Sequence, residues 1–456
     1  MLRRRWSRAA PVDRPIRRLH GAQLVLAGFA AAIAVGTALL MLPFARTGPG
    51  GASPVAALFT ATSAVCVTGL NVVDTARYWT GFGQLVIVVL IQLGGLGIAT
   101  FASVVGLAML GRLSIRSKLT VNAESRGEGL AEVGTVLFSV VRISLVVEAV
   151  VAVLLTARFA VGGEPLPRAV WLGVFHAVSA FNNAGFSLFG SRNLLDYARD
   201  PFVCLPIAVA VILGGLGFPV IMQLLRYAGT VRLWTMNTRL VLWGTAVLLV
   251  GGTIYITVLE WSNPATLGPL DWHAKILAGF FQAVQTRTAG FNTVDIGSMH
   301  QATLLGMDIM MFIGAGPASA AGGIKITTFG VLLFIIWTEL RGEAAVNVFG
   351  KRLSRAVHRQ AISVALLSVA VVFAGTVALL LVSRFSTHAV FFEAVSAFAT
   401  VGLSTGITPH LPMVGQLVLV ALMFVGRLGP VTLGAALALR RSRILYELPK
   451  ERPVIG

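Results

Sequence analysis

The chain has 456 residues, of which 56% are hydrophobic and only 12% are charged, and its mean hydropathy is +0.84. A soluble domain carries about 25% charged residues, so this composition could not cover the surfaces of the roughly three soluble domains that the length would allow. Disorder is excluded because it requires low hydrophobicity, and a disulfide framework because Cys66 and Cys204 both lie in apolar stretches. The composition predicts a polytopic membrane protein.

Eight stretches are long and apolar enough to cross a bilayer core, which takes about 20 helical residues. The first follows seven Arg residues in the first twenty positions, and we interpret it as a retained helix because it is long and lacks a clear cleavage site. The expected spans are residues 22–44, 84–110, 133–157, 202–225, 239–260, 301–338, 360–383 and 412–438.

The distribution of basic residues predicts the orientation. Eight spans place both termini on one side, and that side carries 24 of the 36 Lys and Arg residues, against eight on the opposite side. By the positive-inside rule both termini are expected in the cytoplasm. The net charge of +18 therefore reflects topology, and nucleic-acid binding is not expected because no aromatic-interleaved basic module accompanies the charge.

Four shorter apolar stretches, at 55–66, 169–180, 272–284 and 389–398, are too short to cross and are candidate re-entrant half-helices. They are followed by similar sequence motifs, which read SAVCVTGLN, SAFNNAGFS, QTRTAGFN and SAFATVGLS. Aligned on Gly69, Gly185, Gly290 and Gly402, each has a Phe ten residues earlier and a short polar residue two residues later. We expect four helix–pore-helix–helix repeats at 21–111, 112–226, 227–340 and 341–440, between a basic N-terminus (1–20) and a tail (441–456).

Four re-entrant loops around a pseudo-fourfold axis predict an ion pathway. Irregular backbone at membrane depth is tolerated only where it is buried in protein or lines a water-filled cavity. Glycine permits dihedrals that aim carbonyls at one axis, and rings of carbonyl oxygens replace the hydration shell of a monovalent cation. The alternative is that the glycines only make turns. It is less well supported because all four loops share the same aligned glycine and flanking residues. The predicted ion-binding residues are Val67, Thr68, Gly69, Asn183, Ala184, Gly185, Thr288, Ala289, Gly290, Thr400, Val401 and Gly402.

The sixth span contains ten consecutive small residues, 314–323, including one Pro, which cannot form a stable continuous helix. We expect a mobile loop at membrane depth, with a simple kink as the alternative. Arg142, Arg287, Lys325 and Arg427 fall in or near membrane segments and are therefore functional candidates. Arg142 is expected to reach the membrane interface with its long side chain, and Arg287 to anchor the third loop by donating to backbone carbonyls. No catalytic motif or nucleotide fingerprint is present, so we expect neither an enzyme nor a cofactor in this chain.

The segments TSAVCVTG, SAFNNAGF, TRTAGFNT and ATVGLSTG, with the broken sixth span and the C-terminus, resemble the Trk/Ktr/HKT superfamily of potassium transporters. The likeness is strongest to its bacterial KtrB branch and covers essentially the whole chain. It implies potassium uptake across the bacterial plasma membrane, with potassium as the substrate. Sodium-selective plant relatives have Ser at the first filter glycine, so Gly69 argues for potassium.

The resemblance also implies a gate, a dimer and a partner. The homodimer would be held in part by the final carboxylate of Gly456. A cytoplasmic ring of nucleotide-binding KtrA-type RCK subunits would dock on the basic loops 111–130, 226–239 and 341–359, and membrane lipid would surround the helices. Sodium activation, a sodium-permeable transporter and a secondary transporter of another fold stay open; the last would need two halves of opposite topology. The implied gate comprises Gly314, Ala315, Gly316, Pro317, Ala318, Ser319, Ala320, Ala321, Gly322, Gly323, Lys325 and Arg427.

Overall fold

The computed structural model describes residues 21–110, 129–343 and 345–429. The basic N-terminus, most of the first basic loop and the C-terminal tail with Gly456 lie outside the described residues. Expectations for those segments therefore stay predictions.

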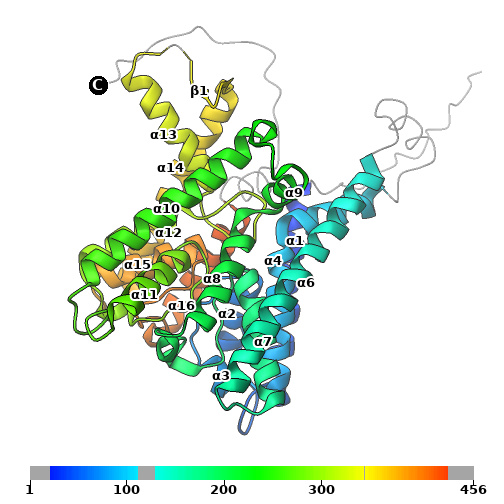
Figure 1. Cartoon of the computed structure of the whole chain (residues 1–456). Helices are drawn as coiled ribbons and strands as arrows, with labels where there is room; N and C mark the ends of the chain where they lie inside the picture. The colour runs from blue at the N-terminus through cyan, green and yellow to red at the C-terminus, as the bar shows by residue number, and fades with distance from the viewer. Residues whose placement is uncertain (1–20, 111–128, 344, 430–456) are drawn as a thin grey trace, which may run out of the picture.

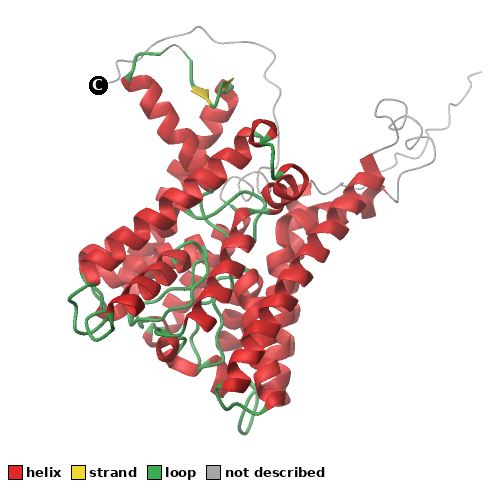
Figure 2. Ribbon diagram, viewed as in Figure 1, coloured by secondary structure: helices red, strands yellow, loops and turns green. Residues whose placement is uncertain are grey.

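Each repeat contributes a long first helix, a buried pore helix and an interrupted or shorter second helix (Figures 1 and 2). A two-stranded antiparallel hairpin, β1 (Asn347–Val348) with β2 (Lys351–Arg352), follows the third repeat. The first repeat contains α1 (Gly21–Leu40), α2 (Pro54–Val65), α3 (Thr75–Tyr78) and α4 (Gly81–Leu110); the second contains α6 (Gly129–Val161), α7 (Leu166–Phe181), α8 (Pro201–Leu216) and α9 (Phe218–Tyr227). The third contains α10 (Met236–Glu260), α11 (Trp272–Gln285), α12 (Gln301–Ile313) and α13 (Ile326–Leu340); the fourth contains α14 (Arg355–Val382), α15 (Thr387–Ala399) and α16 (Met413–Leu428).

Short 3₁₀ turns complete the connections between helices. Five of them lie in the loops that lead into or out of the pore helices, and η4 joins α9 to α10. They are η1 (Pro43–Ala45), η2 (Gly190–Arg192), η3 (Leu195–Tyr197), η4 (Val231–Leu233), η5 (Ile296–Ser298) and η6 (Thr408–His410).

The four pore helices are α2, α7, α11 and α15, and two of them, α2 and α15, begin at a capping serine. Ser53 accepts a hydrogen bond from the Ala56 amide through its Oγ atom, with Pro54 directly after it, and Ser386 caps α15 in the same way. Such caps satisfy amides that the helix leaves unpaired. Each pore helix matches its predicted range to within a few residues, so the re-entrant segments could be read from hydropathy alone.

Three described helices are long and apolar enough to cross a membrane: Phe138–Val161, Met236–Glu260 and Arg355–Val382. The pair α8 and α9, bent by 97° at Gly217, is a fourth candidate. The other predicted spans coincide with apolar helices that are shorter or interrupted within the described residues. One of them, α4, also breaks, because Gly97 has φ 31° and ψ −136°. The sequence predicted only one broken span, so the breaks at Gly97 and Gly217 are new.

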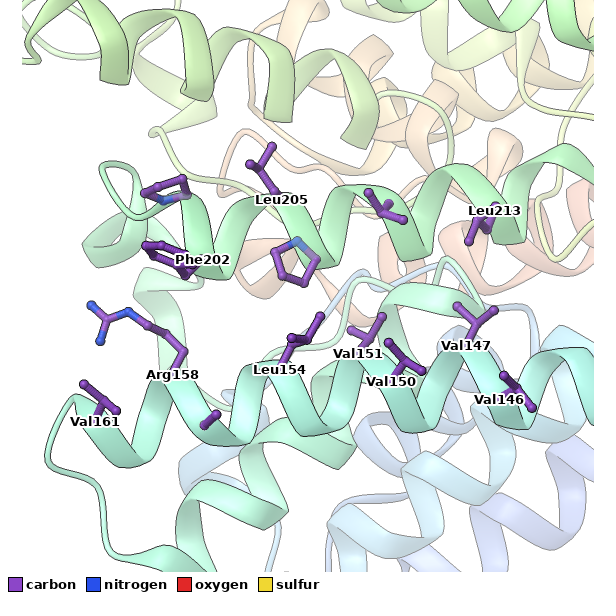
Figure 3. A pocket seen from close by; sticks show the side chains of 14 residues that line it. Val146, Val147, Val150, Val151, Leu154, Arg158, Val161, Phe202, Leu205 and Leu213 are labelled. Atoms are coloured by element: carbon purple, nitrogen blue, oxygen red, sulfur yellow. The ribbon is translucent and has the colours of Figure 1, made fainter.

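The outer surface of the bundle is apolar. Side chains such as Val153 and Leu381 are exposed on the first helices of their repeats, as expected for a surface that faces acyl chains. An apolar groove of about 690 Å³ lies between α6 and α8 (Figure 3). The single charged side chain in its lining is Arg158, whose Nε donates to Asp200 Oδ2 at 2.7 Å.

Candidate ion pathway

The backbone after each pore helix alternates between positive and negative φ. The residue two before each aligned glycine and the glycine itself both have positive φ, whereas the residue between them does not. Alternation of this kind turns successive carbonyl groups to the same side, and at non-glycine positions it costs of order 1–3 kcal/mol. The positive values are 55° at Val67 and 91° at Gly69, 56° at Asn183 and 68° at Gly185, 70° at Thr288 and 79° at Gly290, and 52° at Thr400 and 90° at Gly402.

The four loops touch one another in a closed ring. At each aligned glycine, an added Cβ would collide with the carbonyl oxygen just before the next glycine around the ring. Because no side chain fits there, each of these positions requires glycine. A Cβ added to Gly69 would lie 2.4 Å from Ala184 O, one added to Gly185 2.5 Å from Ala289 O, one added to Gly290 2.5 Å from Val401 O, and one added to Gly402 2.0 Å from Thr68 O.

Side chains in the last turn of each pore helix hold the loop that follows. The Gly69 amide donates to Ser63 Oγ at 3.0 Å, and the Gly402 amide donates to Ser396 Oγ at 3.1 Å. In the second repeat, the Oγ of Ser179 donates to the carbonyl oxygen of Phe186 at 2.9 Å. The third repeat has no Ser at this position, and Gln285 Oε1 accepts from the Phe291 amide at 3.2 Å instead.

Glycines on the second helices allow those helices to abut the ends of the pore helices. A Cβ on Gly94, Gly214 or Gly426 would lie 2.0, 1.8 or 1.7 Å from the carbonyl oxygen of Val65, Phe181 or Phe398, respectively. These carbonyls each lie four residues before an aligned glycine. The glycine clusters of these three repeats therefore serve close packing against the pore helices.

The ring opens onto a polar cavity of about 500 Å³ that all four aligned glycines line. The short polar residues two positions after each glycine also line it: Asn71, Ser187, Asn292 and Ser404. Asp74 and Asp295 contribute the carboxylates of the cavity wall and cap the N-termini of α3 and η5. Negative charges at the mouth of such a cavity raise the local concentration of cations.

The loop from Gly314 to Lys325 lies directly beneath the ring. A Cβ on Gly322 would lie 2.2 Å from Thr400 Oγ1, so this glycine contacts the start of the fourth loop. On the opposite side the loop pairs with the second repeat, because the Gly316 amide donates to the Gly215 carbonyl at 2.9 Å and the Phe218 amide to the Ala318 carbonyl at 3.3 Å. The expected non-helical segment is present, and it packs against two other repeats.

Comparison with known proteins agrees with this architecture. A family model described as TrkH, a cation transport protein, matches residues 15–443. The chain belongs to the TrkH family of cation transport proteins. It is 39% identical to the Ktr system potassium uptake protein B of Bacillus subtilis over 90% of this chain and 91% of the relative, and 36% identical to the protein of the same name from Vibrio alginolyticus over 95% and 94%.

The fold is similar to the crystal structure of the potassium transporter TrkH from Vibrio parahaemolyticus, with a TM-score of 0.73 at 17% sequence identity over 94% of this chain and 86% of that one. The prediction of an all-α, polytopic membrane fold, in which four helix–pore-helix–helix repeats surround a pseudo-fourfold pore, is confirmed. The short hairpin β1–β2 is a minor addition to this fold.

Two cationic side chains of this TrkH-family chain bind backbone carbonyls at the loop beneath the ring. Arg427, buried near the end of α16, donates through Nη1 to the Ala320 carbonyl and through Nη2 to the Gly94 carbonyl. Lys325 donates to the carbonyls of Ala321 at 2.6 Å and Gly322 at 3.3 Å. Arg427 therefore ties the loop to the first repeat, and Lys325 folds the loop onto itself.

The expectation for Arg287 is wrong. The sequence predicts that its guanidinium donates to loop carbonyls, but Nε and Nη2 have no hydrogen-bond partner among the described residues. Arg287 instead lines a small cavity with Val211, Ile212 and Leu249, between α8, α10 and α11. The third loop is held by Gln285 instead. This residue could not be predicted, because the other three repeats use a Ser at a different position of the motif.

From the sequence, His176 is expected to be packed or bonded to a partner and Glu393 to be structural, but their contacts with the loops nine residues further along are not predicted. His176 Nε2 accepts from the Leu188 amide at 3.3 Å and lies 3.2 Å from Ser187 Oγ. Glu393 Oε1 accepts from the Thr405 amide at 3.1 Å and from the hydroxyl of Ser404. Both side chains therefore reach the second and third residues after their glycine. The shared nine-residue offset, together with Ser at both partner positions, could have indicated this pairing.

Proposed function

We propose that the chain takes up potassium ions across the bacterial plasma membrane through the ring formed by its four loops. The closed ring of carbonyl-lined loops carries this proposal. Carbonyl oxygens replace the hydration shell of a monovalent cation, and the C-terminal ends of the pore helices turn partial negative charge toward the ring. The twelve predicted ion-binding residues form these loops, and the acidic cavity above them supplies cations.

Potassium is favoured over sodium by two observations. Both relatives from Bacillus subtilis and Vibrio alginolyticus carry the name potassium uptake protein. The first loop has Gly69, where sodium-selective relatives of the resembled superfamily have Ser. A sodium-permeable pathway is the alternative, and measuring uptake of both ions separates the two.

The loop from Gly314 to Lys325 is proposed as the gate. Its contact with Thr400 supports an obstruction directly below the ring, and the charges of Lys325 and Arg427 oppose the passage of a cation. Its first ten residues are all small, so few side chains have to be displaced when the backbone of the loop changes conformation. An ion that leaves the ring would therefore pass only when this loop moves.

Regulation is proposed to come from other subunits. Two relatives are named as protein B of a Ktr system, which supports the presence of further subunits. The family resemblance implies that these are a second copy of this chain and a cytoplasmic, nucleotide-binding ring of KtrA-type RCK subunits, and the distribution of basic residues supports a cytoplasmic position for both termini. The described candidate docking loops are 226–239 and 341–359. The second of these contains the hairpin β1–β2 with exposed Lys351 and Arg352, which offers a defined basic surface to such a partner.

The deciding experiment is ion uptake by bacteria that lack their own potassium transporters and express this chain with and without a KtrA-type subunit. Growth at low external potassium is expected, and Gly402→Ser should abolish it because a side chain would collide with the Thr68 carbonyl. Gly163→Ser is the matched control, since Gly163 has φ 94° but a Cβ added to it would have no atom within 4 Å.

Loss of uptake in both variants would mean that backbone strain alone is responsible, and it would count against the ring. Growth stimulated equally by sodium and potassium would support the sodium-permeable alternative. No uptake of either ion, with the protein present in the membrane, would refute the proposed substrate.

A further inference from the structure

A cavity of about 260 Å³ lies away from the ring, between α12, α13, α14 and α15. Its lining is aliphatic and aromatic with one exception, the carboxyl group of Asp308. Along α12, residues Leu305, Asp308, Ile309 and Phe312 share one helical face, as their three- and four-residue spacing requires. The carboxyl group is therefore placed on an otherwise apolar face.

Asp308 is only 3% exposed, and neither carboxylate oxygen has a hydrogen-bond partner among the described residues. Buried polar groups in folded proteins are nearly always paired, so each exception calls for an explanation. The other buried carboxylates of this bundle contrast with it. Glu148 Oε1 accepts from Asn182, and Glu393 accepts from Ser404, Thr405 and Thr408.

The cavity opens toward the lipid phase. Its rim includes Leu305, Ile309 and Phe373, which are 55%, 58% and 58% exposed on the outside of the bundle. Because these rim side chains are apolar, the opening faces acyl chains rather than water.

No charged group within the described part of the chain compensates Asp308. At the start of α13, Lys325 donates to Ala321 and Gly322. On α14, the titratable residues are Arg355, His358 and Arg359, in the first two turns and outside the cavity lining. On α15 they are His388, in the first turn, and Glu393, which binds the fourth loop. On α10, Glu260 is the last residue of the helix, and its carboxylate accepts from the hydroxyl groups of Thr303 and Thr266.

An ionised carboxylate in an apolar, unpaired setting is strongly disfavoured, whereas the neutral acid is tolerated. We propose that Asp308 is a proton-binding site reached from the lipid phase, beside the break between α12 and α13. The cavity wall includes Ile313, which directly precedes Gly314, and Phe329, in the first turn of α13. The proton therefore sits between the two helices that lead into and out of the loop beneath the ring, and this assignment does not depend on the transported ion.

The test is chemical labelling of the full chain in native membranes with dicyclohexylcarbodiimide, a hydrophobic reagent that requires a protonated carboxyl group. The acid proton passes to a carbodiimide nitrogen while the carboxyl oxygen bonds to the central carbon, and rearrangement leaves a stable N-acylurea that contains the whole reagent. Peptide mass spectrometry is expected to find this adduct on Asp308, at a level that falls as the pH is raised.

A water-soluble carbodiimide should not label Asp308, and Asp308→Asn should remove the adduct from this peptide. Glu148 serves as the internal control, because it is buried but hydrogen-bonded and should stay unlabelled. Absence of the adduct at acidic pH, equal labelling by the water-soluble reagent, or labelling that does not change with pH would each overturn the proposal. The wild-type chain carries the decisive readout, so the result does not depend on the folding of a variant.

Discussion

At the scale of single residues, two opposite loops of the ring have an anchor that the other two lack. His176 and Glu393 occupy the same position in α7 and α15 and bind the chain just after Gly185 and Gly402. The equivalent residues of the first and third repeats are Thr60, whose Oγ1 has no hydrogen-bond partner among the described residues, and Phe281. The second and fourth loops are therefore tied to their pore helices twice, by a Ser at the glycine or the residue after it and by His176 or Glu393 further along the chain.

Replacing Glu393 with Leu should loosen the fourth loop. The substitution removes the acceptor for Ser404, Thr405 and Thr408, and hydrogen bonds to a charged group contribute about 1.5–3 kcal/mol each. We expect a loss of discrimination between potassium and sodium of about tenfold, which corresponds to about 1.4 kcal/mol. Competition of sodium against potassium uptake measures it.

Glu393→Gln is the matched control for this prediction. Its amide oxygen can still accept from the Thr405 amide, so discrimination should fall less than in Glu393→Leu. Equal selectivity of the Leu variant and the wild-type chain, with both folded, would contradict an anchoring role for Glu393.

At the scale of elements, the pore helices could be predicted and the helix breaks could not. Hydropathy and the repeated motif locate the pore helices because each is a short apolar run that is followed, within a few residues, by an aligned glycine. The break at Gly217 depends on a partner far away in the sequence: a Cβ added to Gly217 would lie 2.3 Å from the carbonyl oxygen of Pro317, and the Phe218 amide donates to Ala318. Residues 202–225 read as one continuous apolar run, so only the tertiary contact reveals the bend.

Because the second helices approach the pore helices closely, alanine substitutions at two helical glycines should differ in their effect on stability. Gly214→Ala places a methyl group against the Phe181 carbonyl, and overpacking of this kind costs about 1–3 kcal/mol. Gly251→Ala, in α10, meets no atom within 4 Å and should be neutral or stabilising by up to about 1 kcal/mol. Thermal unfolding in detergent measures both, and equal midpoints would contradict the packing role.

The contacts of Arg427 with the loop beneath the ring predict how replacing this residue changes potassium uptake. Arg427→Leu removes both the tie between Ala320 and Gly94 and a positive charge below the ring. We expect potassium uptake at saturating concentration to rise severalfold, because the loop becomes freer and the electrostatic barrier falls.

Arg427→Lys keeps the charge but cannot reproduce both hydrogen bonds, so it separates the two effects. Faster potassium uptake in Arg427→Leu alone would mean that the positive charge forms the barrier. Faster uptake in both variants would mean that the hydrogen bonds to Ala320 and Gly94 form it. An unchanged rate in both, with normal amounts in the membrane, would remove Arg427 from the gate.

At the scale of the whole molecule, the uneven distribution of basic residues and the family relationship together predict a dimer that binds an RCK ring on its cytoplasmic side. The basic loops on the expected cytoplasmic side could be read directly from the sequence, because charge distribution and span count need no tertiary information. The identity of a partner could not be derived in this way, since a basic surface records its charge but not what binds to it. The dimer and the RCK ring rest on the family resemblance, and both stay predictions.

Removal of Gly456 tests the dimer. The terminal carboxylate would move to Ile455, and the dimer contact that the family resemblance implies for Gly456 would be lost, so the dimer should dissociate at a higher protein concentration. Light scattering of the protein in detergent across a dilution series measures this. A chain extended by one residue after Gly456 should have the same effect, and an equally stable dimer in both variants would defeat the prediction.

The circular contacts among the four loops have a consequence for how substitutions combine. Gly69 rests on the second loop, Gly185 on the third, Gly290 on the fourth and Gly402 on the first. The width of the opening is thus a property of the circuit, shared by four segments that differ in sequence. Substitutions in opposite loops, which do not touch directly, should still be non-additive, and a loop transplanted from a related chain should work only when its two neighbours come with it.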